Sequence, residues 1–198
     1  TFIEGYCDPK FAAVKEALQS NLDHGLDVGA CVTVTHKDEV VVDLYGGYLD
    51  ESKSQKWQKD TIINVYSTTK TMSFLCMLML ADRQELNFDA NVANYWPEFA
   101  GNGKEEVKVW HLMNHAAGLS GMDVPVTSQD MYDWDKITSL LAAQKPWWEP
   151  GTAPGYHALT QGYLLGEVLR RITGQTMGQF FKHEIADRLD VDFHIGVP

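Results

Sequence analysis

The stretch Ile62-Ile-Asn-Val-Tyr-Ser-Thr-Thr-Lys70, followed by the apolar run 72–80, decides the fold of this sequence. The β-like residues before Ser67 give way to a helix that is apolar on every side, and such a helix is typical of the centre of a domain. A lysine three residues after a serine lies on the same helix face, with about 5 to 6 Å between the two Cβ atoms. The spacing of Ser67 and Lys70 therefore places an amine within proton-transfer reach of a hydroxyl.

The Ser-x-x-Lys motif alone is weak evidence for catalysis, and its position at the start of this helix strengthens it. Ser67 opens the helix, where unsatisfied backbone N–H groups stabilise developing negative charge. Lys70 follows one turn later among apolar neighbours, and partial desolvation favours its neutral amine. The alternative is a serine N-cap beside a solvated lysine. We favour the catalytic interpretation, because this helix offers little solvated face.

A second candidate residue lies in the loop Glu149-Pro-Gly-Thr-Ala-Pro-Gly-Tyr156. Proline and glycine fix this loop, and rigid loops are good places to hold a catalytic side chain. A tyrosine beside a lysine ammonium has its phenolate favoured, so Tyr156 could accept the proton of the serine and later donate one to a leaving group. The alternative is a half-buried aromatic ring with its hydroxyl in water.

Composition limits the classes of partner. The 198 residues carry a net charge of -11, which argues against nucleic-acid binding, and 44% of them are apolar. The run 72–80 is too short for a membrane span. Three cysteines at unrelated spacings imply no disulfide framework, and no targeting segment is recognisable. The compartment stays open, with a lean towards the cytoplasm.

The periodicity of the chain predicts an α/β protein. A helix begins at Asp8-Pro9 and ends at Gly25, and two strands follow at 30–35 and 40–45. Helical periods dominate after residue 62, at 107–114, 134–144 and 162–172. Two strands bury too little to form a stable sheet, so we expect later strands to be missing from this chain. We predict an N-terminal region at 1–50 and a helical region with the serine helix at 51–198.

With these residues in place, the chain resembles the serine β-lactamase and penicillin-binding-protein superfamily, within its class C-like branch that includes the family VIII carboxylesterases. The resemblance implies an antiparallel sheet flanked by helices, with an inserted helical domain. It further implies that Ser67 is the acylated nucleophile, Lys70 its general base and Tyr156 the tyrosine of the motif written Y-x-N. The matching stretches are 42–47, 64–70, 88–97, 111–119 and 149–174.

Two departures from the family pattern refine this prediction. Ala158 stands where β-lactamases of this branch carry an asparagine that binds the acylamino side chain of the substrate, which favours an esterase. No Lys-Thr-Gly or Trp-x-Gly triplet follows residue 158. We expect that motif on a C-terminal remainder, either a second chain or a segment absent here.

Other constellations are weaker. His111 and His115 have the i, i+4 spacing of a zinc pair, but Leu112 replaces the required glutamate and 116–118 reads as a helix end, so we favour a structural role. His157 could line an acyl pocket. The aromatic residues near the Tyr156 loop could wall a cleft or belong to the core: Tyr132, Trp134, Trp147 and Trp148.

The sequence thus predicts a serine hydrolase that cleaves short or medium-chain carboxylic esters through an acyl-enzyme on Ser67. It needs no cofactor or metal, and weak β-lactam hydrolysis would fit. Its expected partners are a small ester and the C-terminal remainder, with no nucleic acid and no membrane span. The alternatives are an acyltransferase of the same fold, or a catalytically silent scaffold or ligand-binding member.

Overall fold

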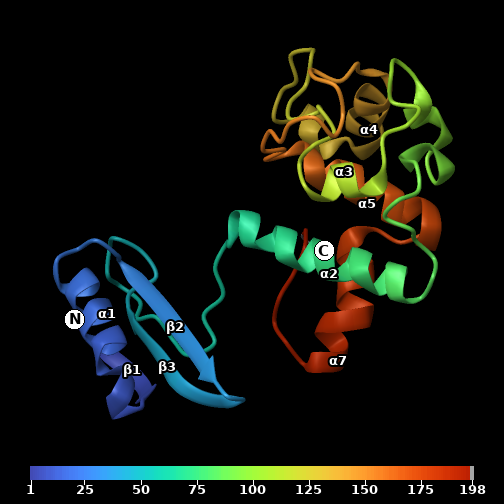
Figure 1. Cartoon of the computed structure of the whole chain (residues 1–198). Helices are drawn as coiled ribbons and strands as arrows, with labels where there is room; N and C mark the ends of the chain where they lie inside the picture. The colour runs from blue at the N-terminus through green and yellow to red at the C-terminus, as the bar shows by residue number, and fades with distance from the viewer. Residues whose placement is uncertain (197–198) are drawn as a thin grey trace. The chain divides into compact units, whose positions relative to one another are not determined.

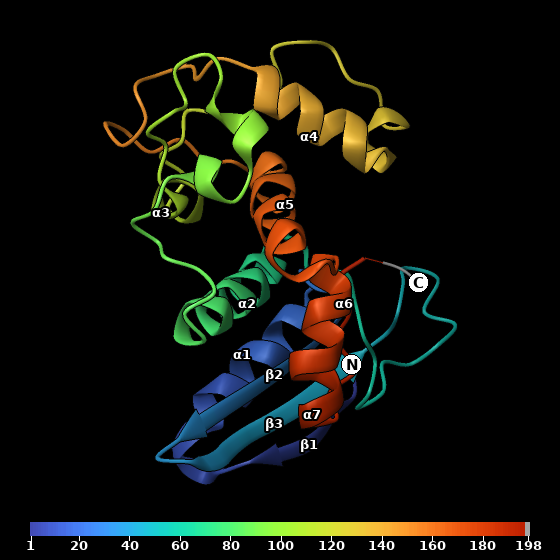
Figure 2. The same ribbon diagram turned by 90° about the vertical axis from the view of Figure 1, so that its right-hand side faces the viewer.

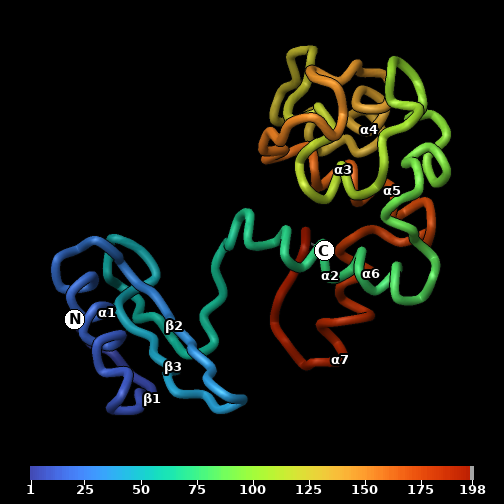
Figure 3. Tube along the Cα trace, viewed as in Figure 1, coloured from blue at the N-terminus to red at the C-terminus, as the bar shows by residue number. Residues whose placement is uncertain are grey.

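The structure, a computed structural model, describes residues 1–196, and the chain divides into two compact units after Ile63. Figure 3 shows the course of the backbone through both units. The first unit holds the sheet, and the second holds Ser67, Lys70 and Tyr156. The candidate site can therefore be described within one unit.

The first unit is a three-stranded antiparallel sheet with a helix on one face (Figure 1). Its strand order is β1-β3-β2, and Leu18 and Leu22 of the helix pack against Val42 and Leu44 of the central strand. Asp8 caps the turn that leads into the helix, as the sequence predicts. The elements are β1 (Ile3–Cys7), a 3₁₀ turn (Pro9–Phe11), α1 (Ala12–Asp23), β2 (Gly29–His36) and β3 (Glu39–Gly47).

Strand β1 is absent from the sequence prediction, which began with a helix. Its residues, Ile3-Glu-Gly-Tyr-Cys7, lack apolar alternation and contain a glycine, so propensity alone does not reveal a strand. Gly5 has φ of +110°, and a Cβ there would lie 2.0 Å from the carbonyl oxygen of Asp43 on β3. This glycine allows the two backbones to approach, and pairing with β3 makes the segment a strand.

The second unit is helical in the described residues, and α5 is its central element. This helix packs against α2 and α6 at one end and against α3 and α4 at the other (Figure 2). Gly174, at φ of +73°, ends α5 as the sequence predicts. The helices are α2 (Thr69–Asp82), α3 (Val109–Met113), α4 (Trp134–Ala143), α5 (Thr160–Thr173), α6 (Met177–Phe181) and α7 (Asp187–Leu189), with a π-helical turn at Lys182–Ala186 and 3₁₀ turns at Tyr66–Thr68, Val92–Asn94, Pro97–Ala100 and Asp130–Tyr132.

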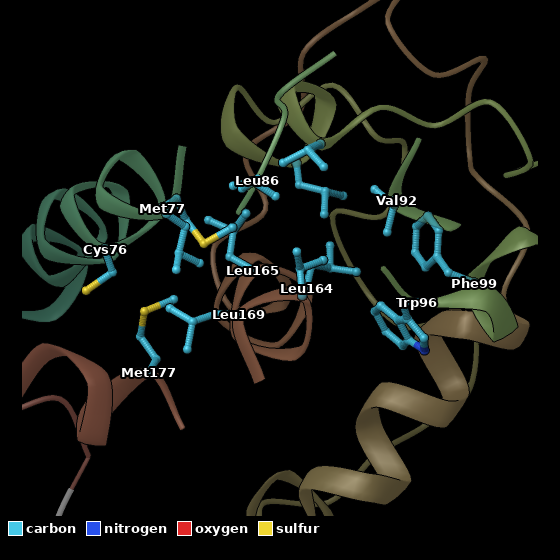
Figure 4. Packing of buried hydrophobic residues seen from close by; sticks show 14 of the residues in the cluster. Cys76, Met77, Leu86, Val92, Trp96, Phe99, Leu164, Leu165, Leu169 and Met177 are labelled. Atoms are coloured by element: carbon cyan, nitrogen blue, oxygen red, sulfur yellow. The ribbon is translucent and has the colours of Figure 1, made fainter. Parts of the chain in front are cut away.

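One hydrophobic core joins these helices. Figure 4 shows Met77 of α2 next to Leu165 of α5, while Trp96 and Phe99 pack farther along the same core. Cys76 is fully buried, as expected for a thiol in an apolar run, and burial raises its pKa to about 12.

The expectation that α2 is buried on every side is wrong for the described chain. Cys76, Met77 and Leu80 face the core, but Leu75 is 41% exposed and Leu78 is 51% exposed. The residues of α2 that face the core lie on the side that packs against α5 and α6. None of the helices within 1–196 has the length and apolar character needed to cross a membrane.

Candidate active site

Ser67 lies in a 3₁₀ turn, Tyr66–Thr68, that runs directly into α2. The residue before it, Tyr66, has φ of +46°, a left-handed conformation that is strained for an aromatic residue. The side chain of Asn64 supports this bend, since its Oδ1 accepts the N–H of Tyr66 at 3.2 Å. Ser67 is exposed, so its hydroxyl is presented at the surface of the second unit.

Lys70 lies one turn farther and is half-buried. Its Nζ donates to Ser67 Oγ at 3.2 Å and to the carbonyl oxygen of Ala158 at 2.8 Å. The Lys70 ammonium thus lies between Ser67 and Ala158, which follows Tyr156 by two positions. The sequence predicts the first contact from helix spacing, whereas the second involves a backbone group for which no sequence signal exists.

Tyr156 completes the group. Its hydroxyl donates to Ser67 Oγ at 2.5 Å, and Lys70 Nζ lies 5.1 Å from the centre of its ring. The hydrogen bond with Ser67, followed by the hydrogen bond and charge of Lys70, lowers the pKa of the Tyr156 phenol. The structure therefore brings Ser67, Lys70 and Tyr156 together, with both partners on the serine oxygen.

The Tyr156 loop is held by the segment 112–119. The N–H groups of Trp147, Gly151 and Gly155 donate to the carbonyls of Gly118, Ala116 and His115, at 2.7, 2.9 and 2.9 Å. Gly155 also has no room for a side chain, because a Cβ there would lie 2.4 Å from the ring of Trp148. These bonds fix the backbone of the loop before the side chain of Tyr156 is placed.

The histidines serve this anchoring. His157 is fully buried, its Nδ1 lies 2.5 Å from the carbonyl oxygen of Gly155, and its Nε2 accepts the N–H of Leu119 at 3.0 Å. It therefore supports the loop and does not line an acyl pocket. Burial lowers the pKa of His157 and keeps it neutral.

His111 and His115 do not form a zinc pair. Helix α3 ends at Met113, so the two residues do not share a helix face. Each Nδ1 accepts a backbone N–H, from Lys108 at 3.0 Å and from His157 at 3.1 Å. Within residues 1–196 no cluster of three or more histidine, cysteine or acidic side chains could hold a metal ion.

Two cavities adjoin the site. A cleft of about 640 Å³ lies beside Lys70, and Tyr132 and Trp134 are among its lining residues. A smaller, mostly apolar cavity of about 330 Å³ begins at Ala158 and Leu159. Trp147 and Trp148 instead pack against Gly121 and Gly155 and support the loops. Of the four aromatic residues, Tyr132 and Trp134 thus line the cleft, whereas Trp147 and Trp148 support loops.

The chain is similar to known proteins in both sequence and fold. The sequence matches the Beta-lactamase family over residues 18–198. It is 37% identical to the esterase/β-lactamase LipL of Mycobacterium tuberculosis over 98% of this chain and 45% of that protein. It is 44% identical to a family VIII carboxylesterase structure (TM-score 0.93, all of this chain and 55% of that one) and 40% identical to a penicillin-binding-protein homologue from Caulobacter crescentus (TM-score 0.95, 53% of that chain).

The chain spans about half the length of these relatives. The family match covers most of the sequence. The fold agrees with it, since a small antiparallel sheet is followed by a helical region that opens with the Ser-x-x-Lys helix. This chain belongs to the Beta-lactamase family, the serine β-lactamase and penicillin-binding-protein-like superfamily.

Proposed function

We propose that this chain supplies the nucleophile, the base and the acid of a serine hydrolase that cleaves carboxylic esters through an acyl-enzyme on Ser67. The observation that carries the proposal is the double hydrogen bond on Ser67 Oγ, from Lys70 Nζ at 3.2 Å and from Tyr156 at 2.5 Å. A serine hydroxyl is a weak nucleophile until a neighbouring group takes its proton, and both candidates for that role are in contact with it.

In the proposed reaction, Tyr156 takes the proton that leaves Ser67, and the Lys70 ammonium assists this transfer. The proton passes to the phenolate oxygen of Tyr156, whose negative charge the Lys70 ammonium stabilises, while Ser67 Oγ bonds to the ester carbonyl carbon. When the carbonyl re-forms, the bond to the alkoxide oxygen breaks and Tyr156 returns its proton to the alkoxide. Water then repeats the sequence on the acyl-enzyme, releasing the acid and restoring Ser67.

The substrate class follows from the surroundings of Ala158. An alanine side chain offers no hydrogen bond to an acylamino group, which disfavours β-lactams as the main substrate. The apolar cavity of about 330 Å³ that begins at Ala158 and Leu159 suits an aliphatic acyl chain. Short and medium-chain esters are therefore the proposed substrates, with weak β-lactam hydrolysis as a side activity. The relatives named esterase and carboxylesterase support this choice.

We also infer that a C-terminal remainder completes the site. The chain spans about half the length of its relatives, and α2 carries exposed Leu75 and Leu78. The remainder would supply further strands and the Lys-Thr-Gly-like triplet, whose backbone N–H would join that of Ser67 in an oxyanion hole.

The test is intact-mass analysis of the protein with its remainder, before and after a serine-directed phosphonate. One phosphonyl adduct on this chain, together with hydrolysis of p-nitrophenyl butyrate, is expected. Both should disappear in Ser67→Ala and persist in Ser139→Ala, which alters an exposed serine on α4. An adduct that survives in Ser67→Ala would contradict the proposal. If the wild type shows no adduct and no turnover, the silent-scaffold alternative is favoured.

A further inference from the structure

His115 holds the backbone on both sides of Tyr156. Its carbonyl oxygen accepts the N–H of Gly155 at 2.9 Å, and its Nδ1 accepts the N–H of His157 at 3.1 Å. Its ring also packs edge-on against the Tyr156 ring, with 4.9 Å between the ring centres and 62° between the planes. His115 thus contacts the Pro154–Gly155 peptide, the Tyr156–His157 peptide and the ring of Tyr156.

The backbone of His115 is unusual in a way that supports a functional role. Its φ of +65° places it in the left-handed region, where a residue with a Cβ pays a conformational cost. This conformation directs the chain away from the end of α3 and brings both the carbonyl oxygen and the ring of His115 to the Tyr156 loop. A less strained conformation would separate these two contacts.

The hydrogen bond from the N–H of His157 requires that Nδ1 of His115 carry no proton. A ring nitrogen that accepts an N–H carries no hydrogen, so neutral His115 holds its proton on Nε2. The titratable groups that face it are Lys70 on α2 and Tyr156 and His157 on the loop. Burial, and then the charge of Lys70, lowers the pKa of His115 and favours the neutral ring.

We propose that His115 is the positioning residue that holds the Tyr156 hydroxyl against Ser67, and that it does so only as the neutral Nε2–H imidazole. The inference rests on the proposed function for its kinetic consequence. Protonation of Nδ1 would set two N–H donors against each other and place a second positive charge near Lys70. The Tyr156 loop would lose its anchor, and hydrolysis would fall at acidic pH.

Two substitutions separate the roles of His115. Asn tolerates left-handed backbone and can offer Oδ1 in place of Nδ1, but it does not titrate. Gly relieves the strain of the left-handed backbone but offers no side-chain acceptor for the N–H of His157. We expect His115→Asn to keep kcat within about 10-fold at pH 8 and to show a shallower acidic fall in kcat, because only the titration of Tyr156 remains. We expect His115→Gly to lose about 10²-fold in kcat with little change in KM, as a misplaced catalytic group would.

The control is His183→Asn, which removes an exposed histidine of the same unit and should leave the pH profile unchanged. An unchanged acidic limb in His115→Asn, or full kcat in His115→Gly, would overturn the inference.

A measurement independent of activity separates this inference from the proposed function. Two-bond ¹H–¹⁵N correlation spectra should show neutral His115 with hydrogen on Nε2 and neutral His157 with hydrogen on Nδ1 at pH 7. A protonated His115, or one with hydrogen on Nδ1, would overturn the inference whatever the enzyme activity. The expected tautomers in a protein that hydrolyses no ester would support the anchoring and refute the proposed function alone.

Discussion

The two segments that meet at the candidate site are held in opposite ways. The turn that carries Ser67 is exposed and strained, with Tyr66 79% exposed at φ of +46°. The loop that carries Tyr156 is bonded repeatedly to the segment 112–119, and fully buried His157 lies directly after the tyrosine. The comparison teaches that Ser67 relies on local geometry for its position, whereas Tyr156 relies on a network distant in sequence.

The difference has a chemical reason. A serine on a helix takes its position from the helix, and Lys70 comes within reach through helix geometry alone. A phenol on a loop has no such scaffold, so its oxygen stays 2.5 Å from Ser67 Oγ only if the surrounding backbone is fixed. Perturbations of the loop should therefore lower activity and stability together, while those of the turn should change the two in opposite directions.

The largest expected effect comes from Tyr156→Phe. Removing the hydroxyl takes away the group that relays the serine proton, so the rate of ester hydrolysis should fall about 10²- to 10⁴-fold. In the proposed mechanism the base is the Tyr156 phenolate. Because Ser67 and Lys70 lower the pKa of Tyr156, wild-type kcat/KM should rise with pH towards a limit reached below the ordinary tyrosine pKa of 10.0.

The measurement is the pH profile of p-nitrophenyl butyrate hydrolysis for both proteins. Tyr6→Phe, an exposed tyrosine of β1, should leave the profile as it is. An alkaline limb that persists unchanged in Tyr156→Phe would assign the titration to another group.

Gly155→Ala should perturb the anchoring of the loop. The new Cβ would lie 2.4 Å from the ring of Trp148, and such overpacking typically costs about 1 to 3 kcal/mol in the free energy of unfolding. The matched control is Gly162→Ala, where no atom lies within 4 Å and alanine stabilises a helix by up to about 1 kcal/mol relative to glycine. Urea unfolding of both variants measures the difference. Equal stability in the two would show that the loop yields easily.

The same contrast explains how much of the molecule the sequence predicts. The contact between Ser67 and Lys70 was predictable because helix spacing is a local signal, and the helices over 134–144 and 162–172 follow from periodicity in the same way. The edge strand β1 and the anchoring role of His115 were not predictable. Each depends on a partner distant in sequence, Asp43 in one case and His157 in the other.

Acid should weaken the anchoring network through its histidines. Burial lowers the pKa of His111, His115 and His157 below the ordinary value of 6.5. The unfolded chain takes up protons near pH 6.5 while the folded chain does not, so this stability is complete above that pH and is lost as pH falls below it. Tm should be lower at pH 5 than at pH 8 by several degrees, and His115→Asn should reduce the difference. A flat Tm across this range would contradict the prediction.

The smallest expected effect lies on the other side of the comparison, at Tyr66. A left-handed conformation costs a non-glycine residue about 1 to 3 kcal/mol, and glycine removes this cost. Glycine also loses more conformational entropy on folding, which offsets part of the gain, so Tyr66→Gly should stabilise the protein by about 1 kcal/mol. Thermal unfolding measures this gain. The strain presents Ser67 to its partners, so the variant should unfold at higher temperature while its kcat falls because the turn is freer. A gain in stability with unchanged kcat would mean that the contacts to Lys70 and Tyr156, without the strained turn, suffice to hold the nucleophile.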